Sequence, residues 1–146
     1  MNNIASASHP PPSQTSISKS DPERSKSSLK QSDGELLIYI KMQEFLVWLF
    51  PTLNKFPKNQ RLVMTQQISN SALDSLRMIL RARNAKTLRK KAVILFDLNV
   101  ELEVLRKLLS TANAIGFLPN KQTEHGIIRL MELGRMCGGW IKAVQE

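Results

Sequence analysis

After residue 34, apolar side chains recur at steps of three and four residues along most of the chain, which is the spacing of one helix face. The clearest stripe consists of Leu95, Leu98, Leu102, Leu105, Leu109 and Ala112. Such alternating steps are typical of helices that pack in a bundle. No stretch alternates with period two over a useful length, so the pattern predicts an all-α protein without a sheet.

Turn and capping residues divide the pattern into four predicted helices. These run from Asp33–Glu35 to about Asn54, from Lys58 to Arg83, from Thr87 to about residue 115, and from Pro119 to Val144. Phe56-Pro57-Lys58 forms the first break, Thr87 is a suitable N-cap, and Gly116 suits a helix end. Helices of this length with short loops predict an antiparallel up-down-up-down four-helix bundle over residues 35–146.

The predicted first helix is apolar on nearly every face. Its core stripe is Ile38, Met42, Phe45 and Leu49, but Leu37, Ile40, Val47, Trp48 and Phe50 lie on other faces. One small bundle cannot cover all of these faces, and we therefore expect one of them to lie in a subunit interface. The expected core stripes of the second and fourth helices are Val63/Met64, Ile68, Ala72, Leu73, Leu76 and Leu80, and Ile127, Leu130/Met131, Gly134, Cys137, Ile141 and Val144.

Residues 1–34 differ from the rest of the chain, with Pro10-Pro11-Pro12 followed by a serine-rich stretch. A segment of this composition buries too little apolar surface to offset its chain entropy, so we expect a disordered extension. It holds four Lys or Arg and three Asp or Glu, whereas residues 35–146 hold 17 and 9. The positive charge therefore belongs to the predicted bundle.

The whole chain of 146 residues carries a formal net charge of +9, which favours an anionic partner, with nucleic acid the first candidate. A single cysteine, Cys137, excludes an internal disulfide and fits a reducing cytoplasm. We expect no signal peptide and no membrane span, because the longest strongly apolar run, residues 45–50, is much too short.

Signatures of catalysis and metal binding are missing from the sequence. There is no Glu-x-x-His pair of the di-iron bundles, no phosphate loop and no dinucleotide fingerprint. His125 is expected at the surface or in an interface, and Cys137 is expected to be a buried structural thiol. We therefore expect neither an enzyme nor a cofactor, a metal site or a small-molecule substrate.

Basic residues gather where the predicted second helix ends and the third begins. No acid interrupts the cluster, which consists of Arg77, Arg81, Arg83, Lys86, Arg89, Lys90 and Lys91. Cations are favourable at a helix C-terminus but unfavourable in a first turn, so the residues at 89–91 indicate phosphate binding. A looser second group is Lys58, Arg61 and Lys121, expected at the opposite end of the bundle.

The predicted fourth helix contains glycines at 126, 134, 138 and 139, each of which costs about 1 kcal/mol relative to alanine in a helix interior. Such a helix is expected to pack very close to something else. We interpret Trp48, Gly134, Arg135, Gly138, Gly139 and Trp140 as packing or interface residues.

The segment Glu132-Leu133-Gly134-Arg135-Met136-Cys137-Gly138-Gly139-Trp140-Ile141, together with Phe56-Pro57-Lys58 and Arg61, resembles the accessory variability determinant (Avd) family of diversity-generating retroelements. The resemblance covers about residues 36–144. A sister family encoded in 23S rRNA intervening sequences shares Phe-Pro-Lys and a Gln67-Ile68 pair, but usually continues with a small-residue segment that is absent here.

The Avd resemblance implies a barrel-shaped homopentamer of four-helix protomers. It further implies a non-catalytic subunit that binds the retroelement's reverse transcriptase and template RNA, with cDNA or other DNA as a further candidate ligand, to support mutagenic cDNA synthesis. Two alternatives stay open at this point: a protein-only scaffold that grips the polymerase through its basic end, and an rRNA intervening-sequence protein.

Overall fold

A computed structural model describes residues 22–145, with side chains for residues 33–60 and 62–145. By its internal contacts the chain divides into Met1–Lys30 and Gln31–Glu146, and the bundle belongs to the second unit. Its α-helices are α1 (Pro22–Leu53), α2 (Gln66–Asn84), α3 (Leu88–Ala114) and α4 (Asn120–Gln145). Between α1 and α2 lie a short 3₁₀ turn, η2 (Lys58–Gln60), and a π-helical turn, η3 (Arg61–Thr65).

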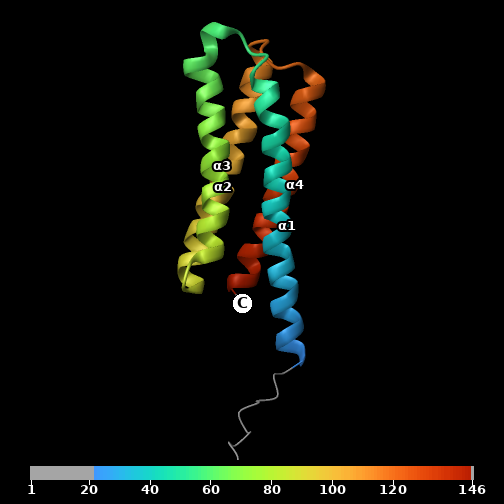
Figure 1. Cartoon of the computed structure of the whole chain (residues 1–146), viewed down its shortest axis with the longest axis vertical. Coiled ribbons are helices and arrows are strands. Elements are labelled where there is room, and N and C mark those ends of the chain that lie inside the picture. The colour runs from blue at the N-terminus through green and yellow to red at the C-terminus, as the bar shows by residue number, and fades with distance from the viewer. Residues whose placement is uncertain (1–21, 146) are drawn as a thin grey trace, which may run out of the picture. The chain divides into compact units, whose positions relative to one another are not determined.

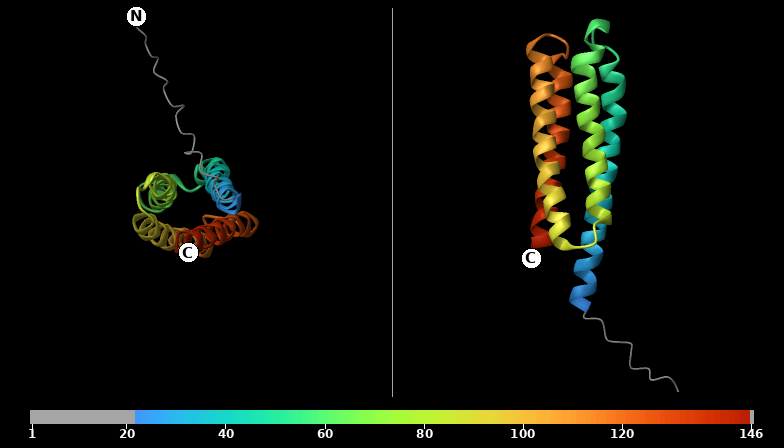
Figure 2. Two further views of the ribbon diagram at one scale, coloured as in Figure 1. Left: turned by 90° about the horizontal axis from the view of Figure 1, so that it is seen from below. Right: turned by 90° about the vertical axis from the view of Figure 1, so that its left-hand side faces the viewer.

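The four helices pack antiparallel, which confirms the predicted all-α bundle (Figure 1). The connections from α1 to α2 and from α3 to α4 share one end, and the connection from α2 to α3 lies at the other (Figure 2). Viewed end-on, the helices follow one another around the core in chain order, so α1 and α3 lie diagonally opposite. The up-down-up-down order follows from the short loops, which join only neighbouring helices.

The first helix begins at Pro22 rather than at Asp33–Glu35, so that boundary was predicted wrongly. Proline suits the first turn of a helix, where its missing N–H has no partner anyway. Pro22 is a start signal that the serine-rich composition hid. The rest of the predicted extension, residues 1–21, lies outside the described residues.

The core face of α1 is as predicted, since Ile38, Met42, Phe45 and Leu49 are at most 1 % exposed. The opposite face is apolar and open to solvent, with Val47 75 % exposed and Leu36 and Ile40 also exposed. Residues 33–53 are long and apolar enough to cross a membrane by length and composition alone. A count of consecutive apolar residues misses this, but the buried face makes the segment the core helix of the bundle.

The predicted core stripe of α2 was partly wrong. Ile68 and Ala72 are buried, but Val63 and Leu80 are exposed, and the helix turns Ser71, Ser75, Ile79 and Ala82 inward. Two serines can face the core because each hydroxyl has an acceptor: Ser71 donates to the carboxylate of Glu101 on α3, and Ser75 donates to the carbonyl of Ser71. A count of apolar residues cannot predict these inward serines, because it does not register their hydrogen-bond acceptors.

All six predicted core residues of α3, from Leu95 to Ala112, are buried. The side chain of Thr87 accepts a hydrogen bond from the backbone N–H of Lys90 at 3.1 Å, which confirms the predicted N-cap. Gly116 adopts a φ of 86° just after the helix, a conformation that side chains other than glycine rarely adopt. Local signals therefore determine both ends of this helix.

In α4 the predicted inward residues Leu130, Cys137, Ile141 and Val144 are buried, but Met131 is 44 % exposed. Gly126 meets the expectation of close packing, because a Cβ there would lie 2.7 Å from the Trp48 ring and 2.8 Å from Leu109 Cδ1. A Cβ on any of the other three helical glycines, Gly134, Gly138 and Gly139, would meet nothing within 4 Å in the protomer. These three glycines therefore have no close packing within the protomer, and their expected role in an interface stays a prediction.

Candidate nucleic-acid interface

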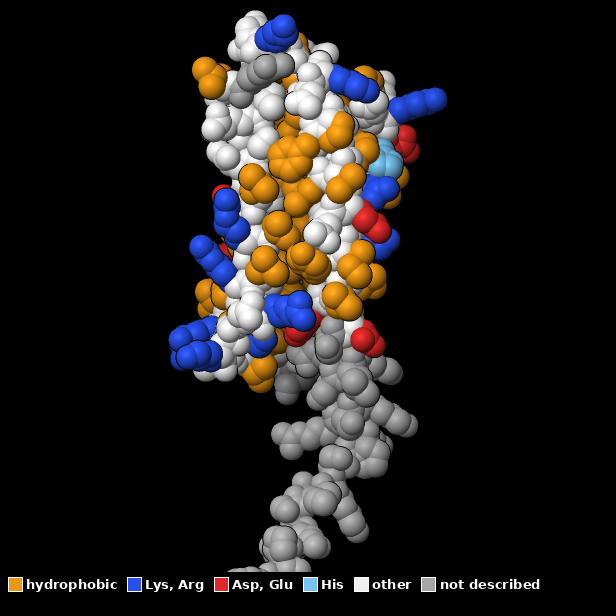
Figure 3. Space-filling model, viewed as in Figure 1, with side chains coloured by type: hydrophobic (Ala, Val, Ile, Leu, Met, Phe, Trp, Pro, Cys, Tyr) orange, Lys and Arg blue, Asp and Glu red, His pale blue; other side chains and the backbone are white. Residues whose placement is uncertain are grey.

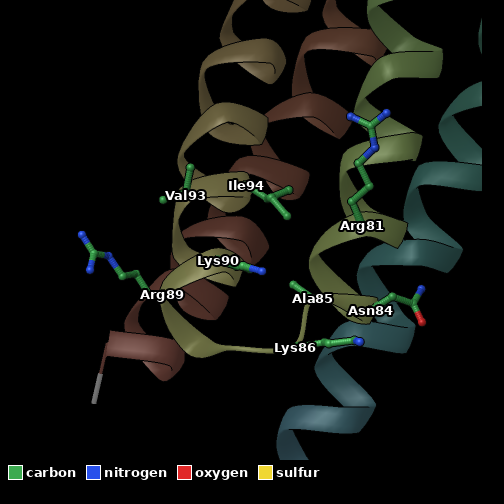
Figure 4. A pocket seen from close by; sticks show the side chains of 8 residues that line it. All are labelled: Arg81, Asn84, Ala85, Lys86, Arg89, Lys90, Val93 and Ile94. Carbon is green, nitrogen blue, oxygen red and sulfur yellow. The ribbon is translucent and has the colours of Figure 1, made fainter.

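An open hollow of about 810 Å³ lies at the connection between α2 and α3. Its rim carries the cations Arg81, Lys86, Arg89 and Lys90, while Ala85, Val93 and Ile94 supply apolar surface. Figure 4 shows Lys90 and Ile94 extending from α3 toward α2, whereas Arg89 extends away on the other side of α3. The hollow therefore has cations on more than one side and an apolar floor.

The predicted basic cluster gathers at this end of the bundle, as the Lys and Arg side chains at the lower left of Figure 3 show. Five of its members are exposed and have no ion-pair partner among the side chains that the structure describes: Arg81, Arg83, Lys86, Arg89 and Lys90. Arg77 differs, because its guanidinium lies 2.7 Å from the carboxylate of Asp74. Since both partners are more than half exposed, this pair contributes little stability and leaves Arg77 partly neutralised.

Lys91, the last member of the predicted cluster, has a structural contact. Its ammonium donates hydrogen bonds to the carbonyls of Ala82 and Arg83, both at 3.1 Å. These carbonyls belong to the last turn of α2, where backbone acceptors lack partners inside the helix. Lys91 thus closes the end of α2 from α3 and holds the turn that displays Arg83 and Lys86.

The first turn of α3 contains no acidic residue, although acids are favourable there. Instead, the cations Arg89 and Lys90 occupy that turn. The helix dipole and the side chains therefore add to one positive potential, which attracts anions such as phosphate. Nothing in the described bundle compensates for this charge within the hollow, whose lining residues include no acid.

The second predicted group lies at the opposite end of the bundle. Lys58 is exposed in η2 and Lys121 is exposed in the first turn of α4, at the end where both connections meet (Figure 1). Arg61 begins the π-helical turn, but its side chain lies outside the described part of the chain. The candidate residues therefore form two separate basic ends, and the cluster at the α2–α3 connection is the denser one.

The sequence patterns did not predict a network of charged and polar side chains between α1 and α4. Glu44 lies 3.6 Å from Lys41 and 3.8 Å from Arg129, and Lys41 also lies 3.8 Å from Glu132. Arg129 donates from Nε to His125 Nε2 at 2.7 Å. The expected surface position of His125 is confirmed, since it is exposed, and its ring lies 5.1 Å from that of Trp48. These contacts join two helices that are far apart in sequence, so only the fold brings them together.

The cysteine and the tryptophan of the glycine-rich segment face the interior. Cys137 donates its thiol to the carbonyl of Leu95 at 3.3 Å, and burial raises the pKa of this thiol to about 12. A thiol with this pKa is an inert packing group, as expected. Trp140 is 6 % exposed and belongs to the core.

Comparison with known proteins adds the family. The model of one family, described as bAvd-like, matches residues 36–144. This chain belongs to the bAvd-like family. Its members are the Avd accessory proteins of diversity-generating retroelements, a family known as non-catalytic accessory proteins. Among curated proteins, no match is found. Membership in the bAvd-like family covers the whole helical bundle from Leu36 to Val144 and decides between the two sister families.

Proposed function

We propose that this bAvd-like protein is a nucleic-acid-binding subunit that holds the template RNA of its retroelement against the reverse transcriptase during mutagenic cDNA synthesis. The main support is the cluster of exposed cations without an acid at the α2–α3 connection, namely Arg81, Arg83, Lys86, Arg89 and Lys90. Contacts of Lys and Arg with phosphates bind strongly at low salt and carry little sequence information. The protein itself contributes binding and positioning, and the chemistry belongs to the polymerase.

The test is RNA binding by the purified protein at two salt concentrations. We expect affinity for a structured RNA to fall steeply as salt rises, because each phosphate contact releases counterions. Charge reversal of Arg81 and Arg89 together is expected to weaken binding about tenfold or more while the helical circular dichroism stays unchanged. Arg77→Glu is expected to act less strongly, since Asp74 already pairs with this side chain.

A matched control is Lys107→Glu, an exposed cation on α3 away from the α2–α3 connection. It makes the same change in net charge, so it separates a local site from general attraction. Equal losses for the control and for a single Arg81→Glu variant would reject the site. Absence of RNA binding at low salt would reject the function.

We further propose that the protein acts as a homopentamer in the cytoplasm. Support comes from two exposed apolar faces on diagonally opposite helices: Leu36, Ile40 and Val47 on α1, and Val93, Phe96, Val100 and Val104 on α3. Different faces that bind each other head-to-tail generate a ring when the rotation closes. Light scattering is expected to give the mass of five chains, and Val100→Lys is expected to reduce it. A monomer at micromolar concentration would reject the assembly.

A second function, a protein-only scaffold for the polymerase, is favoured by one observation. The hollow at the α2–α3 connection has apolar surface from Ala85, Val93 and Ile94 below its cations. Phosphates need no such floor, whereas an acidic protein surface with an apolar side chain would use both. An oligomer that binds the reverse transcriptase of its element but no RNA at low salt would support this scaffold over the first proposal.

A further inference from the structure

The groove between α3 and α4 contains a second, smaller hollow of about 240 Å³, which the proposed phosphate contacts do not use. It lies beside Gly134 and Arg135, which belong to the Avd-like segment of residues 132–141. Pockets for drug-sized ligands have volumes of about 300–1,000 Å³, so this hollow suits a smaller group. A volume of this size is too small for a duplex or a whole helix.

The lining of this hollow combines three kinds of group. Leu102, Leu130 and Met131 supply its apolar lining, of which only Met131 is exposed, and Asn99, Arg106 and Arg135 contribute side chains with donors. Neither arginine has an ion-pair partner among the side chains of residues 33–60 and 62–145. None of the lining residues is acidic. The hollow therefore combines two arginines without an ion-pair partner with apolar surface from Met131.

Gly134 keeps the hollow open on the α4 side. A Cβ at this position would meet no atom within 4 Å, so packing inside the protomer gives no reason for glycine. Glycine in a helix interior lowers helix stability relative to alanine. A flat group lying against the α4 backbone would explain the residue, because only glycine lets a ligand approach so closely.

These features match the chemistry of one unpaired nucleotide. Unstacked bases of RNA bind on apolar and guanidinium surfaces, and their edges form hydrogen bonds with amide side chains such as Asn99. A second guanidinium beside the base can bind the adjoining phosphate. Resting on the proposed RNA binding, we propose that the α3–α4 hollow binds a single unpaired base of the RNA. The α2–α3 cations then supply affinity, and this hollow distinguishes single strands from duplex.

The test compares one labelled, unstructured oligoribonucleotide with the same strand annealed to its complement, using the full chain and fluorescence anisotropy. Three variants alter the hollow without changing charge: Asn99→Ala, Gly134→Ala and Arg135→Lys, which loses the planar guanidinium. Each is expected to weaken single-strand binding about tenfold, a typical value for one stacked base. Duplex affinity is expected to stay within about twofold.

Gly139→Ala is the matched control, because this exposed glycine also has free space around it but does not line the hollow. Both glycine variants are expected to raise Tm, whereas only Gly134→Ala is expected to weaken single-strand binding. This combination separates a ligand contact from a folding defect. Thermal scans of the two variants at the same protein concentration provide the comparison.

Equal losses on single strand and duplex, or no loss on either, would overturn the base site while leaving the proposed RNA binding intact. A reduced particle mass for Gly134→Ala would show that the hollow faces a second copy and would also overturn it. Failure of the unaltered protein to bind either RNA would reject the proposed function and the base site together. These outcomes are distinguishable within one set of titrations.

Discussion

Gly126 is the glycine on which the packing of α1 against α4 depends, and its replacement by alanine gives the sharpest test of this fold. A methyl group there would lie 2.7 Å from Trp48 Cη2 and 2.8 Å from Leu109 Cδ1. Neither neighbour can yield easily, because the Trp48 ring packs against Phe45 at 5.7 Å and Leu109 is fully buried. Forcing such an overpacked contact costs about 1–3 kcal/mol.

The opposing effect is helix propensity, which favours alanine over glycine by about 1 kcal/mol. Because two buried or half-buried side chains must move, we expect the packing term to win, so that Gly126→Ala lowers the free energy of unfolding by up to about 2 kcal/mol. Gly139→Ala makes the same chemical change where no atom lies within 4 Å, so it should raise the free energy of unfolding by about 1 kcal/mol.

Urea denaturation followed by circular dichroism measures both variants, at equal chain concentration because assembly adds to apparent stability. The comparison depends on the difference between two positions of one helix, so errors in the extrapolation largely cancel. If Gly126→Ala were as stable as Gly139→Ala, the ring of Trp48 would not be held against α4, and the reasoning would be refuted.

Three further predictions follow from single contacts. Lys91→Met should lower the free energy of unfolding by about 1 kcal/mol, because it leaves two carbonyls at the end of α2 without their donor. The neighbouring Lys90→Met should change this free energy by less than about 0.5 kcal/mol, and urea titration of both variants measures the difference. Thr87→Ala should lower the same quantity by about 0.5–2 kcal/mol through loss of the N-cap of α3, and a stability equal to that of the unaltered protein would contradict the cap. Burial raises the pKa of Cys137 from 9.0 to about 12, so the folded protein should not react with a thiol reagent at pH 8 and should react once unfolded in urea. Because the folded thiol keeps its proton up to the higher pH, its contribution to stability is complete below pH 9 and is lost as pH rises toward 12, and a free energy of unfolding that increases over this range would contradict the assignment.

Local patterns in the sequence were enough to predict much of the fold. The leucine stripe of α3 is buried at every predicted position, and its cap at Thr87 and its end at Gly116 are as expected. These features depend on residues within one or two helical turns, so the sequence contains them directly. The start of α1 was missed because the serine-rich composition was given more weight than the start signal at Pro22.

The candidate interface was predictable in outline but not in its members. A run of cations without an acid is visible in the sequence, and the α2–α3 connection keeps them together. Their partners in the fold determine which of these cations are available to bind a phosphate. Arg77 forms an ion pair with Asp74, and Lys91 donates a hydrogen bond to a carbonyl at the end of α2. The sequence marked Gly134 and Arg135 as packing or interface residues but gave no sign of the hollow that they share with Asn99 and Arg106, because its residues come from two helices.

By itself, then, the sequence determined four helices, their order, the α3 core and a basic end, because periodicity and capping are properties of neighbouring residues. Tertiary structure alone decided which face each helix turns inward and which glycines are closely packed within the protomer. Ser71 and Ser75 face the core because Glu101 and a backbone carbonyl accept their protons, and Gly126 is needed because Trp48 packs onto it. The carboxylate of Glu101 lies on α3 and the ring of Trp48 lies on α1, and no local pattern encodes a distance between helices.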